Sequence, residues 1–429
     1  MADADELEIG SLGAQGEGVA ARGQERLFIP YALPGERWRL RAGAPADLVR
    51  PRPDRAAPLC RHFGSCGGCL AQHMPAALYA DWKRGIVVDA FRHRGIDAPV
   101  GELVPVLPGS RRRLALCARR SSDGLRLGFH RAGAHDIVDI GECPIALPEL
   151  VAALPVLRQM LEPVLAGRAE ATVHMLATRA GIDVSLVFAH LESPRRHYPR
   201  LAALAARAGF ARLAVGGEAV MLGREPVLEL GGVQVVPPPG AFVQAVEASE
   251  AHMLRLALEA TAGARRIADL FCGLGTFTLP LARRARLLAV DSDGEAVAAL
   301  AAAARRARHL QPIETRVRDL YRMPLSPKEL EDFDAVVLDP SRAGARAQAE
   351  ELARSPVPTV VAVSCSPGTL ARDARILHDG GYALEAVTPI DQFLFSAHVE
   401  AVAVFRRQSR PSQGRKRPTR RAYATKSSP

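Results

Sequence analysis

The feature that most constrains the fold is an alternation of strand-like and helix-like segments that fills residues 237–407. Its strand-like runs, which are rich in Val, Leu and Ala, are RIADLF, LLAVDSD, FDAVVLDP, TVVAVSCSP and VEAVAVF. Continuous apolar strands between helices are typical of a mainly parallel sheet that is covered on both faces. The pattern therefore predicts an α/β domain with a doubly wound, Rossmann-like sheet, which begins at the PPPG turn of residues 237–240.

Two segments precede this domain and one follows it. Residues 1–50 contain short strand-like runs between turns, which suits a small antiparallel barrel of the oligonucleotide-binding kind or another small β-domain. Residues 51–236 begin with a Pro/Arg-rich linker and then mix helix-like and strand-like stretches, so we expect a central α+β domain. Residues 408–429 are rich in Lys, Arg, Pro and Ser, a composition that predicts a disordered basic tail.

The formal net charge of +10 does not by itself identify a partner. Nine Lys and Arg residues and no acidic residue lie between residues 406 and 429, so the rest of the chain carries only about +1. A nucleic-acid partner is compatible with this balance but is not required by it. The chain has no long uncharged apolar run and begins with the acidic MADADELEIG, so we expect a cytoplasmic protein without a membrane partner.

A group of cysteines indicates a metal or cluster site. The loop CRHFGSCGGC places Cys60, Cys66 and Cys69 close together, and Cys143 in DIGECPI is the natural candidate for a fourth ligand. The chain has seven cysteines, and an odd number in a long cytosolic protein argues against a disulfide framework. The spacing leaves zinc and iron–sulfur both open, and the competing interpretation is a set of buried, inert thiols.

A glycine-containing turn marks the expected cofactor site. The stretch DLFCGLGTFTLPLA runs from a strand through a turn into a helix, and Asp291 ends the strand that follows. Glycines let the backbone approach a nucleoside, and a carboxylate at a strand end accepts hydrogen bonds from ribose hydroxyls. The third glycine of the dinucleotide fingerprint is missing, which favours S-adenosylmethionine over NAD.

Three further strand ends carry reactive side chains. Asp339 in VVLDPSRAG lies where ligands of open α/β sheets bind, without the Pro-Cys or Pro-Pro-aromatic signatures of cytosine and amine methyltransferases. Cys365 follows an apolar strand and precedes a Pro-Gly turn, which favours a nucleophile over a packed core thiol. Glu400 opens the last strand, where a carboxylate is either solvated or directed into the cleft.

Taken together, these motifs resemble the bacterial RNA uracil-5-methyltransferase family, and specifically its iron–sulfur, ribosomal-RNA branch. The matching stretches are CRHFGSCGGC with CPI, FVQ, LFCGLGTFTLPLA, LDPSRAG, SCSPGTLARD and HVEAV. The resemblance implies a class I S-adenosylmethionine-dependent methyltransferase domain, an N-terminal TRAM barrel and a central iron–sulfur domain. It further implies that the protein, expected as a monomer, converts a single-stranded or loop uridine of 23S rRNA to 5-methyluridine.

The resemblance also assigns roles to individual residues. It implies a [4Fe-4S] cluster on Cys60, Cys66, Cys69 and Cys143, and an S-adenosylmethionine site formed by Gln244, Phe271, Gly273, Thr276, Asp291, Asp319 and Asp339. It implies Cys365 as nucleophile and Glu400 as base, and RNA contacts through Arg111, Arg112, Arg113 and Phe242. One departure matters most: Val246 stands where the family usually carries Asn, so a polar group is missing near the cofactor or the base.

The chemistry of uracil agrees with a Cys and a carboxylate at the cofactor site. Uracil C5 is a poor nucleophile until a thiolate adds to C6, and a base must later remove the C5 proton. The alternatives are a tRNA uracil-5-methyltransferase, a non-catalytic iron–sulfur RNA-binding protein, and a methyltransferase for cytosine, an amine or a small molecule. A binding module has no need for both Cys365 and Glu400, which argues against the second.

Overall fold

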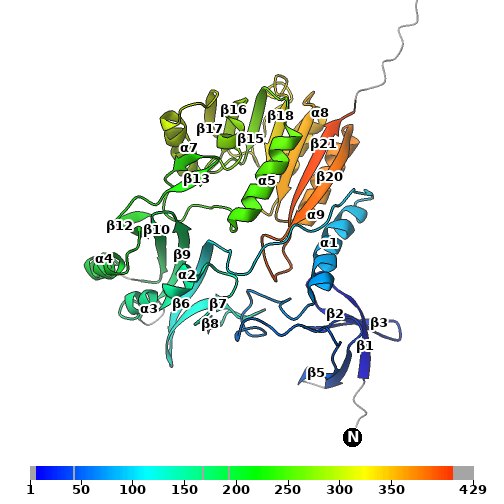
Figure 1. Cartoon of the computed structure of the whole chain (residues 1–429), viewed down its shortest axis with the longest axis vertical. Coiled ribbons are helices and arrows are strands. Elements are labelled where there is room, and N and C mark those ends of the chain that lie inside the picture. The colour runs from blue at the N-terminus through cyan, green and yellow to red at the C-terminus, as the bar shows by residue number, and fades with distance from the viewer. Residues whose placement is uncertain (1–5, 42–43, 167–168, 192–193, 409–429) are drawn as a thin grey trace, which may run out of the picture.

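Five short strands build an antiparallel sheet at the N-terminus of the computed structural model, which describes residues 6–41, 44–166, 169–191 and 194–408 (Figure 1). The strands are β1 (Glu6–Leu12), β2 (Gly18–Arg22), β3 (Glu25–Ile29), β4 (Arg37–Arg41) and β5 (Ala44–Arg50), in the order β3-β2-β1-β4-β5. Ile9, Ile29 and Trp38 are buried in its small core. Within the described residues no pairing joins the outer strands β3 and β5, so the predicted closure into a barrel is not confirmed.

The central part of the chain forms a second, larger sheet. Its strands are β6 (Arg113–Ser121), β7 (Gly124–His130), β8 (Ile137–Asp139), β9 (Glu170–Thr178), β10 (Gly181–Ala189), β11 (Arg212–Val215) and β12 (Glu218–Leu222), in the order β12-β11-β10-β9-β6-β7-β8. The helices are α2 (Pro148–Ala152), α3 (Leu154–Leu161) and α4 (Tyr198–Arg207), the last preceded by the short 3-10 helix η1 (Pro194–His197). Leucines of α3 and α4 are buried with the apolar side chains of β6, β9 and β10, which gives the expected α+β core.

The C-terminal part confirms the predicted doubly wound α/β domain. Its strands are β15 (Arg266–Leu270), β16 (Arg286–Asp291), β17 (Ile313–Val317), β18 (Ala335–Leu338), β19 (Thr359–Ser364), β20 (Tyr382–Ile390) and β21 (Glu400–Arg407), in the order β17-β16-β15-β18-β19-β21-β20. The first five of these strands pair in parallel, and β21 runs antiparallel to both β19 and β20. Because β21 is reversed, its first residue lies at the edge where the parallel strands end.

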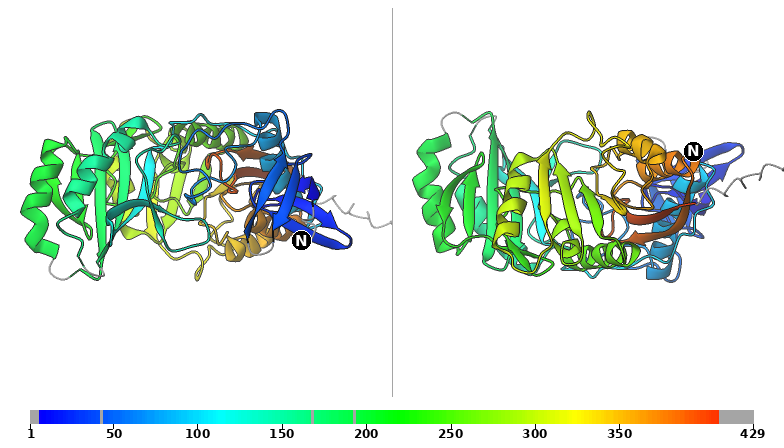
Figure 2. Two further views of the ribbon diagram at one scale, coloured as in Figure 1. Left: turned by 90° about the horizontal axis from the view of Figure 1, so that it is seen from below. Right: turned by 90° about the horizontal axis from the view of Figure 1, so that it is seen from above.

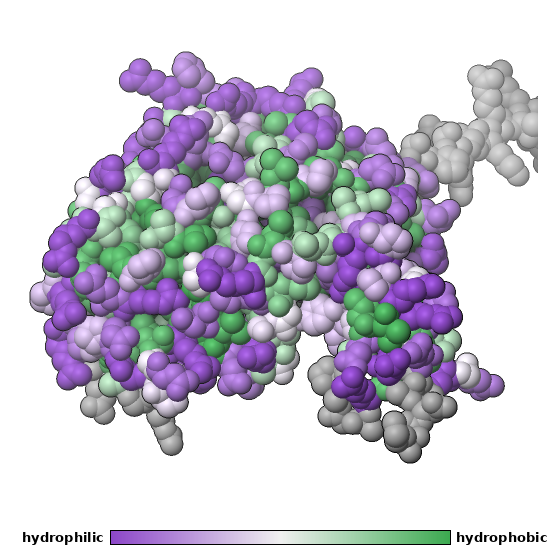
Figure 3. Space-filling view, turned by 60° about the horizontal axis from the view of Figure 1, so that its bottom comes forward, coloured by the Kyte–Doolittle hydropathy of each residue, from purple (hydrophilic) through white to green (hydrophobic). Residues whose placement is uncertain are grey.

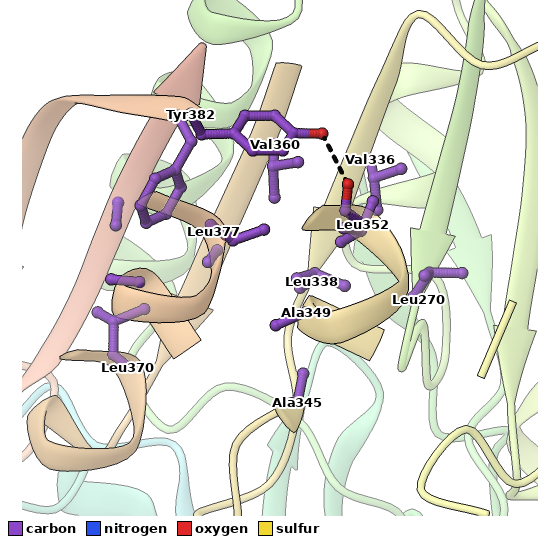
Figure 4. Close-up of a cluster of buried hydrophobic side chains, with 14 of the residues drawn as sticks. Leu270, Val336, Leu338, Ala345, Ala349, Leu352, Val360, Leu370, Leu377 and Tyr382 are labelled. Carbon is purple, nitrogen blue, oxygen red and sulfur yellow. Dashed lines mark hydrogen bonds between the residues drawn. The ribbon is translucent and has the colours of Figure 1, made fainter. Parts of the chain in front are cut away.

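Helices cover both faces of this sheet. They are α5 (Glu247–Ala260), α6 (Thr278–Leu281), α7 (Gly294–Arg306), α8 (Arg346–Arg354) and α9 (Pro367–Asp379), and a two-stranded ribbon of β13 (Leu228–Leu230) and β14 (Val233–Val235) packs beside α7. Alternate residues of one strand point to opposite faces, so Leu270 and Leu338 pack with α8 and α9. Figure 4 shows this cluster, in which the Tyr382 hydroxyl lies 3.4 Å from the carbonyl oxygen of Leu352.

Helix α1 (Ala76–Arg92) lies in the range predicted for the central domain, yet it packs on the α/β domain. Val87 and Phe91 are fully buried in the core formed with α8 and α9. The chain that follows α1 forms isolated bridges with β20, Val100 with Val387 and Val104 with Ile390. The segment after the N-terminal sheet therefore fixes the position of the cysteine loop relative to the C-terminal sheet.

The central sheet and the N-terminal sheet lie at opposite ends of the molecule, on the same side of the α/β domain (Figures 1 and 2). In the space-filling view a notch separates the N-terminal sheet from the rest (Figure 3). None of the helices in the described part of the chain combines the length and apolar character that crossing a bilayer requires. Apart from Gln408, the predicted disordered tail of residues 408–429 lies outside the described residues, whereas Arg406 and Arg407 belong to β21.

Candidate active site

Residues from the N-terminal, central and C-terminal parts line one cavity of about 880 Å³. The carboxyl ends of β15, β16, β18 and β19 open into it, as expected for ligand sites of open α/β sheets. The predicted site residues that line it are Cys60, Cys66, Cys69, Cys143, Arg111, Arg113, Phe242, Gln244, Phe271, Gly273, Thr276, Asp291, Asp339, Cys365 and Glu400. Asp319 and Arg112 are the two predicted residues that do not line it.

The glycine turn after β15 is held in shape by Asp291. Phe271 and Gly273 both adopt positive φ angles, +63° and +51°, which turns the chain back at the strand end. The Gly273 N–H donates to Oδ2 of Asp291 at 2.9 Å, and the Asp293 N–H donates to Oδ1 at 2.9 Å. The half-buried Asp291 carboxylate therefore joins the turn to the start of α7.

Asp319 supports a neighbouring side chain instead of facing the cavity. Its Oδ1 accepts the Tyr321 N–H at 2.9 Å, which shapes the turn after β17. Tyr321 then packs against Phe271, with ring centroids 5.2 Å apart, and its hydroxyl lies 2.9 Å from Oγ of Ser341. Tyr321 lines the cavity and was not predicted, although an aromatic residue shortly after a strand-end Asp was a usable signal.

Two glutamines connect the carboxylates of Asp339 and Glu400. Nε2 of Gln244 donates to Oδ2 of Asp339 at 2.9 Å, and its Oε1 accepts a hydrogen bond from Nε2 of Gln392 at 2.7 Å. The same Nε2 of Gln392 donates to Oε2 of Glu400 at 2.8 Å. Burial raises the pKa of Asp339 to about 7 and that of Glu400 to about 8, the nearby Asp339 adding to the rise at Glu400.

Cys365 lies half-buried between β19 and α9, in the same cavity. Burial and, to a lesser extent, the neighbouring Glu400 raise the pKa of its thiol to about 11, against a smaller lowering effect of Arg342. The thiol is therefore protonated at neutral pH before a substrate arrives. A reaction that uses this sulfur as a nucleophile must remove its proton as the new bond forms.

The four predicted cysteine ligands gather on one side of the cavity. All four thiols are free, and burial raises the pKa of each, that of Cys69 to about 12. Cys69 is also affected electrostatically by the other three, so the four sulfurs are neighbours. Within the described residues, no three His, Cys, Asp or Glu side chains surround one point closely enough to hold a single metal ion.

The three predicted RNA-contacting arginines have different surroundings. Arg113 lies over the exposed ring of Phe242, 4.5 Å from its centroid. Burial lowers the pKa of the partly buried Arg111, and the neighbouring Cys143 and Cys69 partly oppose this shift. Arg112 is buried and does not face the cavity: its Nη2 pairs with Oε2 of Glu250 at 2.6 Å, and its Nε donates to the Gln244 carbonyl oxygen at 3.0 Å. RNA contact by Arg112 remains a prediction that this placement does not favour.

A buried ion pair anchors the loop that precedes Glu400, and sequence reasoning missed it. Nζ of Lys83 on α1 lies 2.9 Å from Oδ1 of Asp391, and both side chains are inaccessible to solvent. Lys83 also donates to the carbonyl oxygens of Phe393 and His398. The Tyr79 hydroxyl, also from α1, donates to Asp391. A lysine in an amphipathic helix gives no local sign that it faces inward, so no signal was available.

Comparisons with known proteins point to one family. Residues 234–408 match the family model described as tRNA (Uracil-5-)-methyltransferase. An uncharacterized RNA methyltransferase of Rhizobium meliloti (strain 1021) is 45% identical over 92% of this chain and 98% of its own length. The 23S rRNA (uracil(1939)-C(5))-methyltransferase RlmD of Pectobacterium atrosepticum is 33% identical over 93% of each chain.

A solved structure shares the fold. The tRNA (uracil-54, C5)-methyltransferase of Pyrococcus abyssi, in complex with S-adenosyl-L-homocysteine, superposes with a TM-score of 0.70 at 23% identity, over 93% of this chain and 99% of that one. This likeness confirms the predicted class I S-adenosylmethionine methyltransferase fold of the α/β domain. Because the sequence similarity to RNA methyltransferases extends over nearly the whole chain, this protein belongs to the RNA (uracil-5-)-methyltransferase family.

Proposed function

We propose that the protein methylates C5 of a uridine in 23S rRNA through a covalent adduct between Cys365 and uracil C6. The observation that carries this proposal is the convergence of Cys365, Glu400 and the glycine turn on one cavity. The chain's similarity to RlmD supports the choice of 23S rRNA.

The residues of the cavity suit the steps of this reaction. S-adenosylmethionine, when bound, supplies a methyl group that an electron-rich carbon can attack. The Cys365 sulfur bonds to C6 of the uracil, and the electron pair of the C5–C6 double bond moves onto C5 and the O4 carbonyl. After C5 has accepted the methyl group, Glu400 takes the C5 proton. The C5–C6 double bond then re-forms and the thiolate leaves.

The charges around Cys365 indicate how its thiol is activated. Glu400 and Asp339 both raise its pKa, and Arg342 is the cation that lowers it. The thiol proton leaves to solvent in the cavity, so that Glu400 is still a carboxylate when the C5 proton has to be removed. Arg342 lines the cavity and lowers the pKa of Cys365, so it would stabilise the developing thiolate. Because its side chain is exposed, it would also contact the RNA strand.

We assign the cofactor site to the glycine turn and the residues around it. Asp291 would accept hydrogen bonds from the ribose hydroxyls, and the rings of Phe271 and Tyr321 offer an apolar surface at the same edge. Gln244 and Asp339 lie beside the catalytic pair and would face the reacting end. Thr276 and Gly273 belong to the turn itself.

We infer that the four thiols on the other side of the cavity hold a [4Fe-4S] cluster. Four neighbouring thiols with raised pKa values are stabilised as thiolates only if positive charge is placed among them. Each cysteine of such a cluster binds a different iron, so the sulfurs stand further apart than around one ion. Cys60, Cys66, Cys69 and Cys143 would hold it, with Arg111 beside the sulfurs.

Phe242 and Arg113 form the surface that best suits an RNA base. Phe242 is 64% exposed although it is a large aromatic residue, and it lies at the cavity under a guanidinium. Stacking on aromatic rings and on arginine is how proteins hold unpaired bases. A uridine that leaves its stack could rest there while C6 approaches Cys365.

Mass spectrometry of 5-methyluridine in separated 23S rRNA and tRNA from a deletion strain tests the substrate. We expect one position of 23S rRNA to lose its methyl group and to regain it with the wild-type gene, but not with a Cys365→Ala variant. Loss of the modification from tRNA instead would establish the tRNA alternative. Unchanged 5-methyluridine in both RNAs would contradict the proposed activity.

A further inference from the structure

Gln392 is a buried polar residue that the reaction described above does not use. It lies between β20 and β21 and is 2% exposed, and its side chain reaches both Gln244 and Glu400. Its Oε1 is buried and has no hydrogen-bond partner. A buried amide that satisfies one end and leaves the other unpaired destabilises the fold, so it calls for a functional explanation.

The two carboxylates determine which way both amides face. An ionised Asp339 accepts hydrogen bonds only, so Gln244 must turn its NH₂ group toward it. The side-chain carbonyl oxygen of Gln244 then faces Gln392, which must donate a hydrogen bond to it from its own NH₂ group. That same NH₂ group reaches Glu400, and its hydrogen bond is strongest while Glu400 is a carboxylate, because a charged acceptor binds a donor more strongly than a neutral one.

Contacts of the residues on either side of Gln392 in the chain fix the position of its backbone. The preceding residue, Asp391, pairs with Lys83 and accepts the Tyr79 hydroxyl. The following segment is tied to the cysteine loop, since the Leu70 and Ala71 N–H groups donate to the Phe395 carbonyl oxygen at 2.8 and 3.1 Å. The backbone on both sides of Gln392 is therefore held in place, so its amide group stays beside Glu400 and changes only by rotating.

We infer that Gln392 is a positioning residue for the base: its NH₂ group holds Glu400 as a carboxylate and, through Gln244, links the protonation of Glu400 to that of Asp339. The inference rests on the proposed function, because it takes Glu400 as the group that removes the C5 proton. When Glu400 accepts that proton, its new O–H needs an acceptor. A rotated Gln392 amide supplies the Oε1 that is otherwise unpaired.

The other charges around Glu400 come from several elements. Asp339 at the end of β18 and Cys365 at the end of β19 are the acidic groups that interact with it. Arg342, in the loop after β18, is a cation close to both Cys365 and His398. Lys83 on α1 and Asp391 at the start of the loop between β20 and β21 form an ion pair, so their opposite charges largely cancel. Among all of these, Gln392 is the group whose hydrogen bond lowers the pKa of Glu400.

The test is the pH dependence of adduct resolution in the full-length protein. Single turnovers with labelled methyl donor and RNA give the rate at which methylated RNA is released from the covalent complex. The variant Gln392→Met replaces the NH₂ donor by an apolar side chain of similar volume, so the pKa of Glu400 rises. The acid limb of the profile, the pH range in which the release rate falls as Glu400 becomes protonated, therefore moves up by about one pH unit. Release at pH 7 should fall about tenfold, while methyl transfer to the bound RNA is kept.

A second variant keeps the test decisive if Met is not tolerated. Gln392→Glu has the same shape and places a second carboxyl against Glu400, so the limb should move in the same direction. Gln348→Met is the matched control, since Gln348 on α8 is equally buried and bonds only the Leu325 backbone. Its pH profile should coincide with that of the wild type.

The outcomes separate this inference from the proposed function. A Gln392→Met profile that superposes on the wild-type profile would overturn the role of Gln392. A wild-type protein that forms no covalent complex with 5-fluorouridine RNA would overturn the proposed function itself, whatever the variants do. A limb that shifts equally in Gln348→Met would show a general effect of lost stability and would also refute the assignment.

Discussion

Replacing Lys83 by Met removes one partner of the most deeply buried ion pair near the active site. The side chains of Lys83 and Asp391 are 0% and 1% exposed, and their charged atoms are 2.9 Å apart. Lys83 also donates to the Phe393 and His398 carbonyl oxygens at 3.2 and 2.5 Å. The variant therefore leaves a buried carboxylate and two carbonyl groups without this donor.

The expected loss follows from what remains around Asp391. Removing one member of a buried pair destabilises a protein by about 3–5 kcal/mol, because the other charge stays buried. Asp391 keeps the Tyr79 hydroxyl as a donor, so we expect a value near the lower end, about 3 kcal/mol. Burial already raises the pKa of Asp391 and Lys83 opposes that rise, so the variant raises it further.

That pKa shift gives the variant a pH signature. A carboxyl whose pKa is higher in the folded protein than in the unfolded chain binds more protons when folded, so stability falls as the pH rises through the two values. The stability difference between wild type and Lys83→Met should therefore be smaller near pH 5 than near pH 8. The double variant Lys83→Met/Asp391→Asn removes both charges, keeps an acceptor for Tyr79, and should regain more than half of the loss.

Urea unfolding followed by tryptophan fluorescence measures these differences. The chain has two tryptophans, and Trp82 on α1 lies next to Lys83, so a Trp38→Phe background leaves one reporter of the region. A Lys83→Met variant within 1 kcal/mol of the wild type at pH 8, or a double variant less stable than the single one, would refute the reasoning.

Three further predictions concern the two bound groups and the base. Asp291→Ala should weaken S-adenosylmethionine binding by about 1.5–3 kcal/mol in calorimetry, whereas Asp293→Ala, which removes only the α7 cap, should leave it unchanged; equal affinities would remove Asp291 from the site. Protein purified without oxygen should be brown and contain iron and sulfide, and Cys143→Ser should lose most of both; a colourless protein with one zinc would contradict the cluster. Because burial raises the pKa of Glu400 to about 8 and only the carboxylate accepts a proton, release of methylated RNA should rise about tenfold per pH unit below that value; a rate independent of pH between 6 and 8 would exclude Glu400 as the base.

The sequence was informative where function depends on strand ends. Parallel strands bring their carboxyl ends to one edge, so Asp291, Asp339 and Cys365 were expected to meet there, and they line one cavity. Glu400 begins its strand instead of ending one, and it joins them because β21 runs antiparallel to its neighbours. The motifs therefore predicted a set of residues that line one cavity, without any knowledge of packing.

What the sequence did not reveal depends on tertiary contacts. The run Arg111–Arg113 is typical of an RNA-contacting surface, yet Arg112 is buried against Glu250 from α5. Lys83 and Gln392 carry no local motif, because their partners lie far away in the chain. Sequence periodicity does not tell on which sheet α1 packs, since an amphipathic face fits either core.

The covalent step is the central claim, and a denaturing gel with labelled RNA containing 5-fluorouridine tests it most directly. Fluorine cannot leave C5 as a cation, so wild-type protein should remain bound to the RNA through denaturation, and Cys365→Ala should not. Cys272→Ala is the matched control, since Cys272 is another thiol of this domain that lines the cavity, and it should still give the shifted band. With ordinary uridine RNA, Glu400→Gln should accumulate a methylated adduct that wild type resolves. A band that persists in Cys365→Ala, or is missing in the wild type, would contradict the account.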